Sequence, residues 1–208
     1  WSSDVCSSDL TPVLVAHPSG EQALRSLLRI AKAIDALNTA IGKTVYWLIL
    51  LSVLVSAGNA VVRYTFSNSS NAWLESQWYM FAAVFLLCAG YTLSLNEHIR
   101  IDIVAGQLSR RAQTWIDIVG DVFFLLPMAL IIMWLSLPMV IDSYVRNELS
   151  SDAGGLIRWP VKILIPIGFA LLALQGVAQF IKRIAFLSGA GPDPGAKAQD
   201  GAMPKPTP

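Results

Sequence analysis

The residue types in this chain that could do chemistry gather in segment 97–102, which reads EHIRID. A carboxylate, an imidazole and a guanidinium this close together could act as general acid, general base and anion binder. The same groups could instead pair with one another, cap a helix end and reach toward lipid headgroups. We favour this structural interpretation and expect His98, Arg100 and Asp102 to be interfacial anchors or partner contacts.

The rest of the sequence offers little support for an enzyme. The chain has two cysteines, Cys6 and Cys88, and two histidines, His17 and His98. Neither pair has the placement of a thiol redox centre or of two axial haem ligands. Glycine-rich phosphate loops and nucleophile elbows are absent from the sequence as well. The sequence therefore predicts no catalytic residues, no cofactor and no metal.

The elements that must position these groups are apolar. Of the 208 residues 54% are hydrophobic and 14% are charged, against about 25% charged in an average soluble domain. The net charge of +1 gives no support for a nucleic-acid partner. Uncharged runs recur at lengths near the roughly 20 residues that cross a bilayer, and they predict transmembrane helices at about 44–64, 75–96, 119–143 and 161–184. We expect an all-α integral membrane protein with a four-helix domain over 44–186.

Residues 21–43 differ from these spans because their apolar residues recur every three to four positions, which places them on one face of a helix and the basic residues on the opposite face. This pattern predicts an amphipathic helix that lies on the membrane surface, with its cations near anionic lipid headgroups. Packing against a soluble partner is the alternative. We interpret 1–20 as a disordered or extraneous leader and 187–208, rich in Gly, Pro and Ala, as a disordered tail.

Lys and Arg are concentrated in alternate connecting segments: before the first span, between the second and third, and after the fourth. This asymmetry places those segments in the cytoplasm. The sequence thus predicts a multi-pass protein with both termini cytoplasmic.

Aromatic side chains mark the outer ends of the second and fourth spans. Trp73, Trp78, Tyr79 and Trp159 have the amphipathic rings that settle at a lipid interface. Glu75 stands among the first three, and it could be solvated or could engage a partner helix or loop; the sequence leaves both open.

Small and amide residues inside the spans predict close helix packing. These are Ser56, Gly58 and Asn59 in the first span, with a polar ligand site at Asn59 as an alternative, and Gln175 and Gln179 in the fourth. The central runs of all four spans lack ionisable residues. Because proton relays and ion paths in membranes normally use such residues, the chain is a poor candidate for a self-sufficient carrier.

Several of these residues together resemble the small permease subunit (DctQ type) of tripartite ATP-independent periplasmic (TRAP) transporters. The similarity covers about residues 25–185. It depends on a tryptophan and a glutamate at the outer edge, an aromatic-rich span, and an H-x-R-[VI]-D pattern at the inner end. The residues that carry it are Trp73, Glu75, Trp78, Tyr79, Phe81, Phe85, Gly90, His98, Arg100 and Asp102, with Trp159, Pro160 and Lys162 further on.

This resemblance implies a subunit of a bacterial inner-membrane complex. Its partners would be a large TRAP permease subunit, which carries the sodium and substrate sites, a periplasmic solute-binding protein, and membrane lipid. The implied function is to brace the scaffold of the large permease during sodium-driven, binding-protein-dependent uptake of an organic acid. The alternative is an independent four-helix membrane protein, such as a redox-enzyme membrane anchor or a small exporter.

Overall fold

The computed structural model describes residues 18–66, 71–95, 108–152, 154–189 and 191. These residues are helical apart from short connections and one isolated antiparallel bridge, between Leu149 and Ile157. Helices long and apolar enough to cross a membrane occupy Leu24–Phe66, Asn71–Ser94, Arg110–Val145 and Trp159–Leu187. The predicted all-α membrane fold with four spans is confirmed.

The first helix, α1 (Pro18–Phe66), runs without a break through the boundary expected near Lys43. Ala31, Asn38, Val45 and Ser52 are all buried, and they recur at intervals of seven residues. A seven-residue repeat keeps one stripe of a helix against its neighbours. The basic amphipathic segment and the first span are therefore two parts of one helix with one inward stripe. The surface location of 21–43 remains a prediction.

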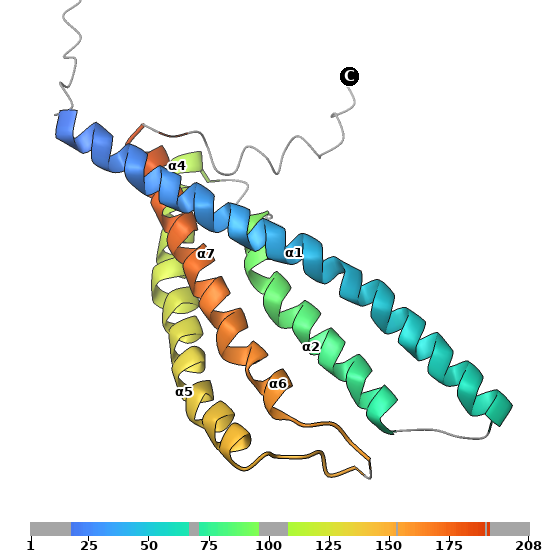
Figure 1. The fold of residues 1–208 in the computed structure, drawn as a ribbon. Helices are drawn as coiled ribbons and strands as arrows, with labels where there is room; N and C mark the ends of the chain where they lie inside the picture. Colours follow the sequence, from blue (N-terminus) through green and yellow to red (C-terminus); the bar gives the residue numbers. More distant parts are fainter. Residues whose placement is uncertain (1–17, 67–70, 96–107, 153, 190, 192–208) are drawn as a thin grey trace, which may run out of the picture.

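Helix α7 (Leu164–Leu187) lies at the centre of the bundle and contacts α1, α2 (Asn71–Ser94) and α5 (Leu126–Val145), as Figure 1 shows. Glycines bring its backbone close to its neighbours. A Cβ on Gly168 would lie 2.7 Å from the carbonyl oxygen of Leu86 in α2, and one on Gly176 would lie 2.7 Å from Leu125. At Gly168 only a residue without a side chain fits, because the contact is with backbone, whereas at Gly176 the tip of the Leu125 side chain could move aside.

The third span is built from α4 (Arg110–Gly120), the π-helical turn η1 (Asp121–Leu125) and α5. Ser109 caps its start by accepting a hydrogen bond from the backbone N–H of Ala112, at 3.4 Å. This cap lets the helix begin at Arg110, earlier than the predicted 119. Pro127 has no N–H to donate to the preceding turn, and the wider π turn lies directly before it.

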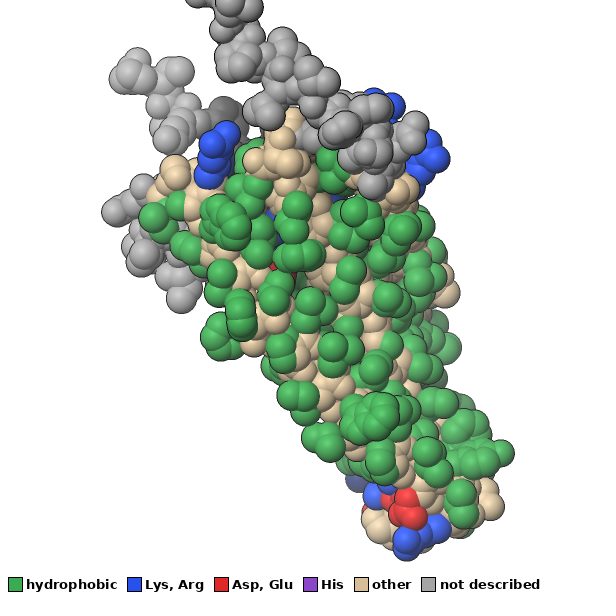
Figure 2. Space-filling model, turned by 90° about the vertical axis from the view of Figure 1, so that its left-hand side faces the viewer, with side chains coloured by type: hydrophobic (Ala, Val, Ile, Leu, Met, Phe, Trp, Pro, Cys, Tyr) green, Lys and Arg blue, Asp and Glu red, His purple; other side chains and the backbone are tan. Residues whose placement is uncertain are grey.

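The fourth span starts with the short α6 (Trp159–Lys162), which has Pro160 near its beginning, a position that suits its fixed backbone angle. The start of α1, helix α4 and the end of α7 lie at one end of the bundle, while the end of α1, the start of α2 and the end of α5 lie at the other (Figure 1). On the face shown in Figure 2 the surface between the ends is mostly apolar, and most of the charged side chains visible lie near the two extremities. Phe85, Phe124 and Trp134 are among the exposed rings of this surface, which suits contact with lipid.

Candidate functional site

Polar side chains join α1 to α7 near the end of the bundle where α1 begins. Asn38 Nδ2 donates to Gln175 Oε1 at 2.8 Å, and Gln175 Nε2 donates to Asp35 Oδ1 at 2.8 Å. Lys182 Nζ completes the chain of contacts by donating to the same Asp35 oxygen at 2.6 Å. Asn38 and Gln175 are fully buried. We call Asp35, Asn38, Gln175 and Lys182 the inner network.

The neighbouring turn of α7 extends these contacts to α2. Gln179 is buried, and its Nε2 donates to the carbonyl oxygen of Leu93 at 3.2 Å. At Gly90, where a Cβ would lie 2.4 Å from Asn38 Oδ1 and 3.2 Å from the carbonyl oxygen of Leu171, helices α1, α2 and α7 meet. Amides that bridge closely packed helices hold their relative positions where no water competes for the hydrogen bonds.

An ion-pair cluster joins α7 to the third span. Arg183 in α7 is buried and pairs with Asp121 through Nη1, and its Nη2 lies 3.6 Å from Asp117 Oδ2. Asp117 and Asp121 are one helical turn apart, so both carboxylates reach the same guanidinium. The planar guanidinium of Arg183 has several N–H donors, so it can bind both carboxylates at once.

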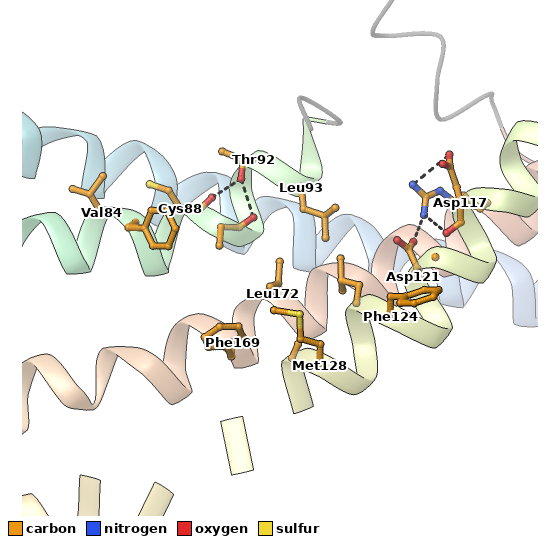
Figure 3. Close-up of a pocket in the computed structure, with 16 residues that line it drawn as sticks. Val84, Cys88, Thr92, Leu93, Asp117, Asp121, Phe124, Met128, Phe169 and Leu172 are labelled. Carbon is orange, nitrogen blue, oxygen red and sulfur yellow. Dashed lines mark hydrogen bonds and ion pairs between the residues drawn. The ribbon is translucent and has the colours of Figure 1, made fainter. Parts of the chain in front are cut away.

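This cluster closes one end of a groove of 810 Å³, shown in Figure 3. Helix α2 forms one side, η1 and α5 form the other, and α7 forms the floor. Its lining is apolar except near the cluster and includes Val84, Cys88, Phe124, Met128, Phe169 and Leu172. Cys88 thus belongs to an apolar wall, as expected for a small hydrophobic side chain.

A second set of contacts lies at the opposite end of the bundle, around Glu75. This side chain is 5% exposed; its Oε1 accepts from the Ser150 hydroxyl, and its Oε2 accepts from the backbone N–H of Leu156 at 2.6 Å. Gly155 allows the approach, since a Cβ there would lie 2.4 Å from Ser150 Cβ. Glu75 therefore engages a loop, but the loop belongs to its own chain and ties α2 to the α5–α6 connection.

Glu148 fastens the same connection to α6. Its Oε2 accepts from Lys162 Nζ, and Arg158 Nη1 lies 3.8 Å from its Oε1. The hydrogen bond from Lys162, aided by the charge of Arg158, holds the pKa of the Glu148 carboxyl below its usual range. This connection is thus anchored at both of its ends.

The aromatic residues singled out in the sequence surround these contacts. Trp73 and Trp78 are exposed on α2, and the Tyr79 hydroxyl donates to the carbonyl oxygen of Ile157 at 3.2 Å. Trp159 packs edge-on against Tyr144, with the ring centroids 5.4 Å apart. Tyr79 and Trp159 therefore have contacts within the chain, whereas Trp73 and Trp78 face outward.

The predicted packing residues divide into two groups. Gln175 and Gln179 lie at the helix contacts described above. Ser56 and Gly58 are exposed, and nothing described lies within 4 Å of a Cβ on Gly58. Packing by Gly58 thus remains a prediction that only a partner could fulfil. His98, Arg100 and Asp102 lie outside the residues that the structure describes.

Sequence reasoning missed the charged and amide partners that the fold brings together: Asp35, Asn38, Asp117, Asp121, Lys182 and Arg183. Asp121, Lys182 and Arg183 lie at the ends of the predicted spans, Asp117 lies just before one, and Asp35 and Asn38 lie in the segment interpreted as lying on the membrane surface. One signal was present, because Asp117 and Asp121 are spaced to share a helix face.

In this arrangement acidic side chains of one helix form ion pairs with basic side chains of another, and these pairs hold the helices together. A search of curated proteins and a search of solved structures each found no match to this chain. The family model described as tripartite ATP-independent periplasmic transporters, DctQ component, matches residues 40–186, which span all four transmembrane helices. The chain therefore belongs to the DctQ component family of tripartite ATP-independent periplasmic transporters.

Proposed function

We propose that this chain braces the large permease subunit of a TRAP transporter in the bacterial inner membrane and does not itself carry solute. The complex takes up an organic acid, delivered by a periplasmic solute-binding protein and driven by a sodium gradient. Both termini of the small subunit are cytoplasmic in this proposal, in keeping with the Lys and Arg residues in the first half of α1, in α4 and near the end of α7.

One observation carries the proposal: the charged side chains between α7 and its neighbours pair with one another across helices. Arg183 pairs with Asp117 of α4 and with the buried Asp121 of η1, and the partly exposed Lys182 pairs with Asp35 of α1. A carrier needs intramembrane groups that bind and release an ion or a substrate. Groups engaged in interhelical pairs instead favour a rigid unit. An apolar exterior around such a unit suits contact with lipid and with the spans of a second subunit.

We also propose that Trp73, Trp78, Trp159, His98, Arg100 and Asp102 act as interfacial anchors or partner contacts. Replacing Arg100 or Asp102 should lower assembly with the large subunit more than it changes apparent sodium affinity. Loss of sodium dependence with assembly intact would contradict this assignment.

Co-purification tests the brace directly. The tagged chain is co-expressed with the large permease encoded beside it and extracted in mild detergent. We expect the two to elute together, and a tagged chain that runs alone would refute the brace.

Reconstitution tests the division of labour. Liposomes that contain only this chain should accumulate no organic acid under a sodium gradient, while liposomes with both membrane subunits and the binding protein should accumulate it. Uptake by the chain alone would support an independent transporter.

A further inference from the structure

A polar groove lies between α1 and α2 where the two helices approach their shared connection. It has a volume of 690 Å³ and differs from the apolar surface around it. Its lining consists of Ser56, Asn59, Ala60, Arg63 and Tyr64 from α1, and Leu74 and Gln77 from α2. This site is distinct from the inner network and from the groove beside Arg183.

The α1 residues recur at steps of three and four, so they form one face of the helix. Arg63 lies one turn closer to the end of the helix than Asn59, about 6 Å along its axis. Gln77 lies one turn further into α2 than Leu74. The groove therefore presents a guanidinium at its outer level and two amides at a deeper level.

None of these donors is used within the described chain. No hydrogen bond or ion pair in that part reaches the side chains of Arg63, Asn59 or Gln77. Exposed Trp73 and Trp78 near the start of α2 mark the level of a membrane interface. The amides lie close to this level, because Gln77 directly precedes Trp78. Water is limited there, and an amide group that lacks a partner is costly. A ligand that supplies acceptors at both levels would remove this cost.

We propose that this groove binds the headgroup region of a phospholipid. The Arg63 guanidinium binds the phosphodiester, aided by the Tyr64 hydroxyl, and the Asn59 and Gln77 amides donate to the ester carbonyl oxygens. The acyl chains then lie on exposed apolar residues further along the same face of α1, Val53 and Ile49. A phospholipid carries a negative phosphate and neutral acceptors at successive depths, as the groove requires, whereas a carboxylate from a protein partner would serve one level only. This assignment needs a membrane-spanning chain and is independent of the brace.

The test titrates the full-length chain in detergent with dioleoyl phosphatidylglycerol and counts bound lipid by native mass spectrometry. Arg63→Gln should weaken binding by about tenfold, as expected for loss of a charge-assisted contact. Arg146→Gln is the matched control, because Arg146 is an exposed arginine at the same end of the bundle, paired with Asp142 at 2.7 Å. It should change lipid affinity by less than about twofold.

Two further arms identify the ligand. Asn59→Leu combined with Gln77→Leu should weaken binding of the intact lipid. Inorganic phosphate should then displace more lipid from this variant than from the wild type, because the lipid is held by its phosphate alone. Inorganic phosphate at equal concentration should displace little lipid from the wild type, because it lacks the ester carbonyls.

Equal effects of Arg63→Gln and Arg146→Gln would overturn the site, as would displacement by inorganic phosphate as effective as by the lipid. Efficient cross-linking of an Asn59→Cys variant to a co-expressed large permease would also overturn it, since the groove would then be a protein contact.

Discussion

At the scale of single residues, Arg183 joins the fourth span to the third through its ion pairs with Asp117 and Asp121. Arg183→Met would leave Asp121 buried without its cationic partner, and removing one member of a buried pair costs about 3–5 kcal/mol. We expect a loss of this size in the free energy of unfolding, measured by steric trapping in bicelles.

The adjacent Lys182 gives a matched control, since its ion pair with Asp35 is partly exposed. Lys182→Met should cost only roughly 1–2 kcal/mol. Adding Asp121→Leu to Arg183→Met should recover part of the loss, because it removes the unpaired charge. Equal costs for the two single variants would contradict the importance assigned to the buried pair.

Glu148 makes a pH-dependent contribution at the opposite end of the bundle. Its pKa is lowered from the ordinary value of 4.5, chiefly by the hydrogen bond from Lys162, so the folded state favours the ionised carboxylate. The resulting stabilisation is complete above about pH 4.5 and is lost as the pH falls through the lowered pKa. The apparent Tm in detergent should therefore fall more steeply below pH 4.5 for the wild type than for Glu148→Gln. Parallel curves would show that this carboxylate contributes nothing.

At the scale of elements, the position of α1 against α2 and α7 depends on Gly90. A Cβ there would lie 2.4 Å from Asn38 Oδ1, so Gly90→Ala should push the helices apart and cost about 1–3 kcal/mol by overpacking. Thermal unfolding of the purified chain measures this cost.

Gly58→Ala is the control, because open space surrounds that position in the described structure. In the isolated chain it should be neutral or slightly stabilising, by about 0.5–1 kcal/mol, since alanine is the better helix former. A lowered yield of the complex from Gly58→Ala, with the isolated chain unaffected, would place a partner helix at Gly58. If Gly58→Ala destabilised the chain as much as Gly90→Ala, the cost at Gly90 could not be assigned to the close contact of α1, α2 and α7.

At the scale of the whole molecule, the distribution of Lys and Arg predicts which connections between helices lie on the periplasmic side of the membrane. In a variant without native cysteines, Ser151→Cys should react with a membrane-impermeant maleimide in intact spheroplasts. Ser188→Cys, just after α7, should react only after permeabilisation. Labelling in the reverse order would invert the topology and remove the proposed cytoplasmic location of both termini.

The sequence alone determined the class of the protein, the four spans and the family resemblance. These follow from one-dimensional quantities: the length of uncharged runs, the position of aromatic rings and a local motif. The position of Pro160 at the start of a helix is also a local property, because its ring fixes its own backbone angle near the helical value and it needs no N–H in the first turn.

Only the tertiary structure decided which residues touch. Asp35 and Lys182 are 147 positions apart, and they meet because α1 crosses α7 at a particular depth and rotation. The structure likewise shows α1 as one continuous helix with a buried stripe, where the charge pattern of 21–43 suggested a separate element. Glu75 shows the same limit, since its local sequence left solvent and a partner open, and the folded α5–α6 connection supplied Ser150 and Leu156. Hydropathy measures the cost of transferring each segment into the membrane, but the pairing of buried polar groups depends on how the helices pack against one another.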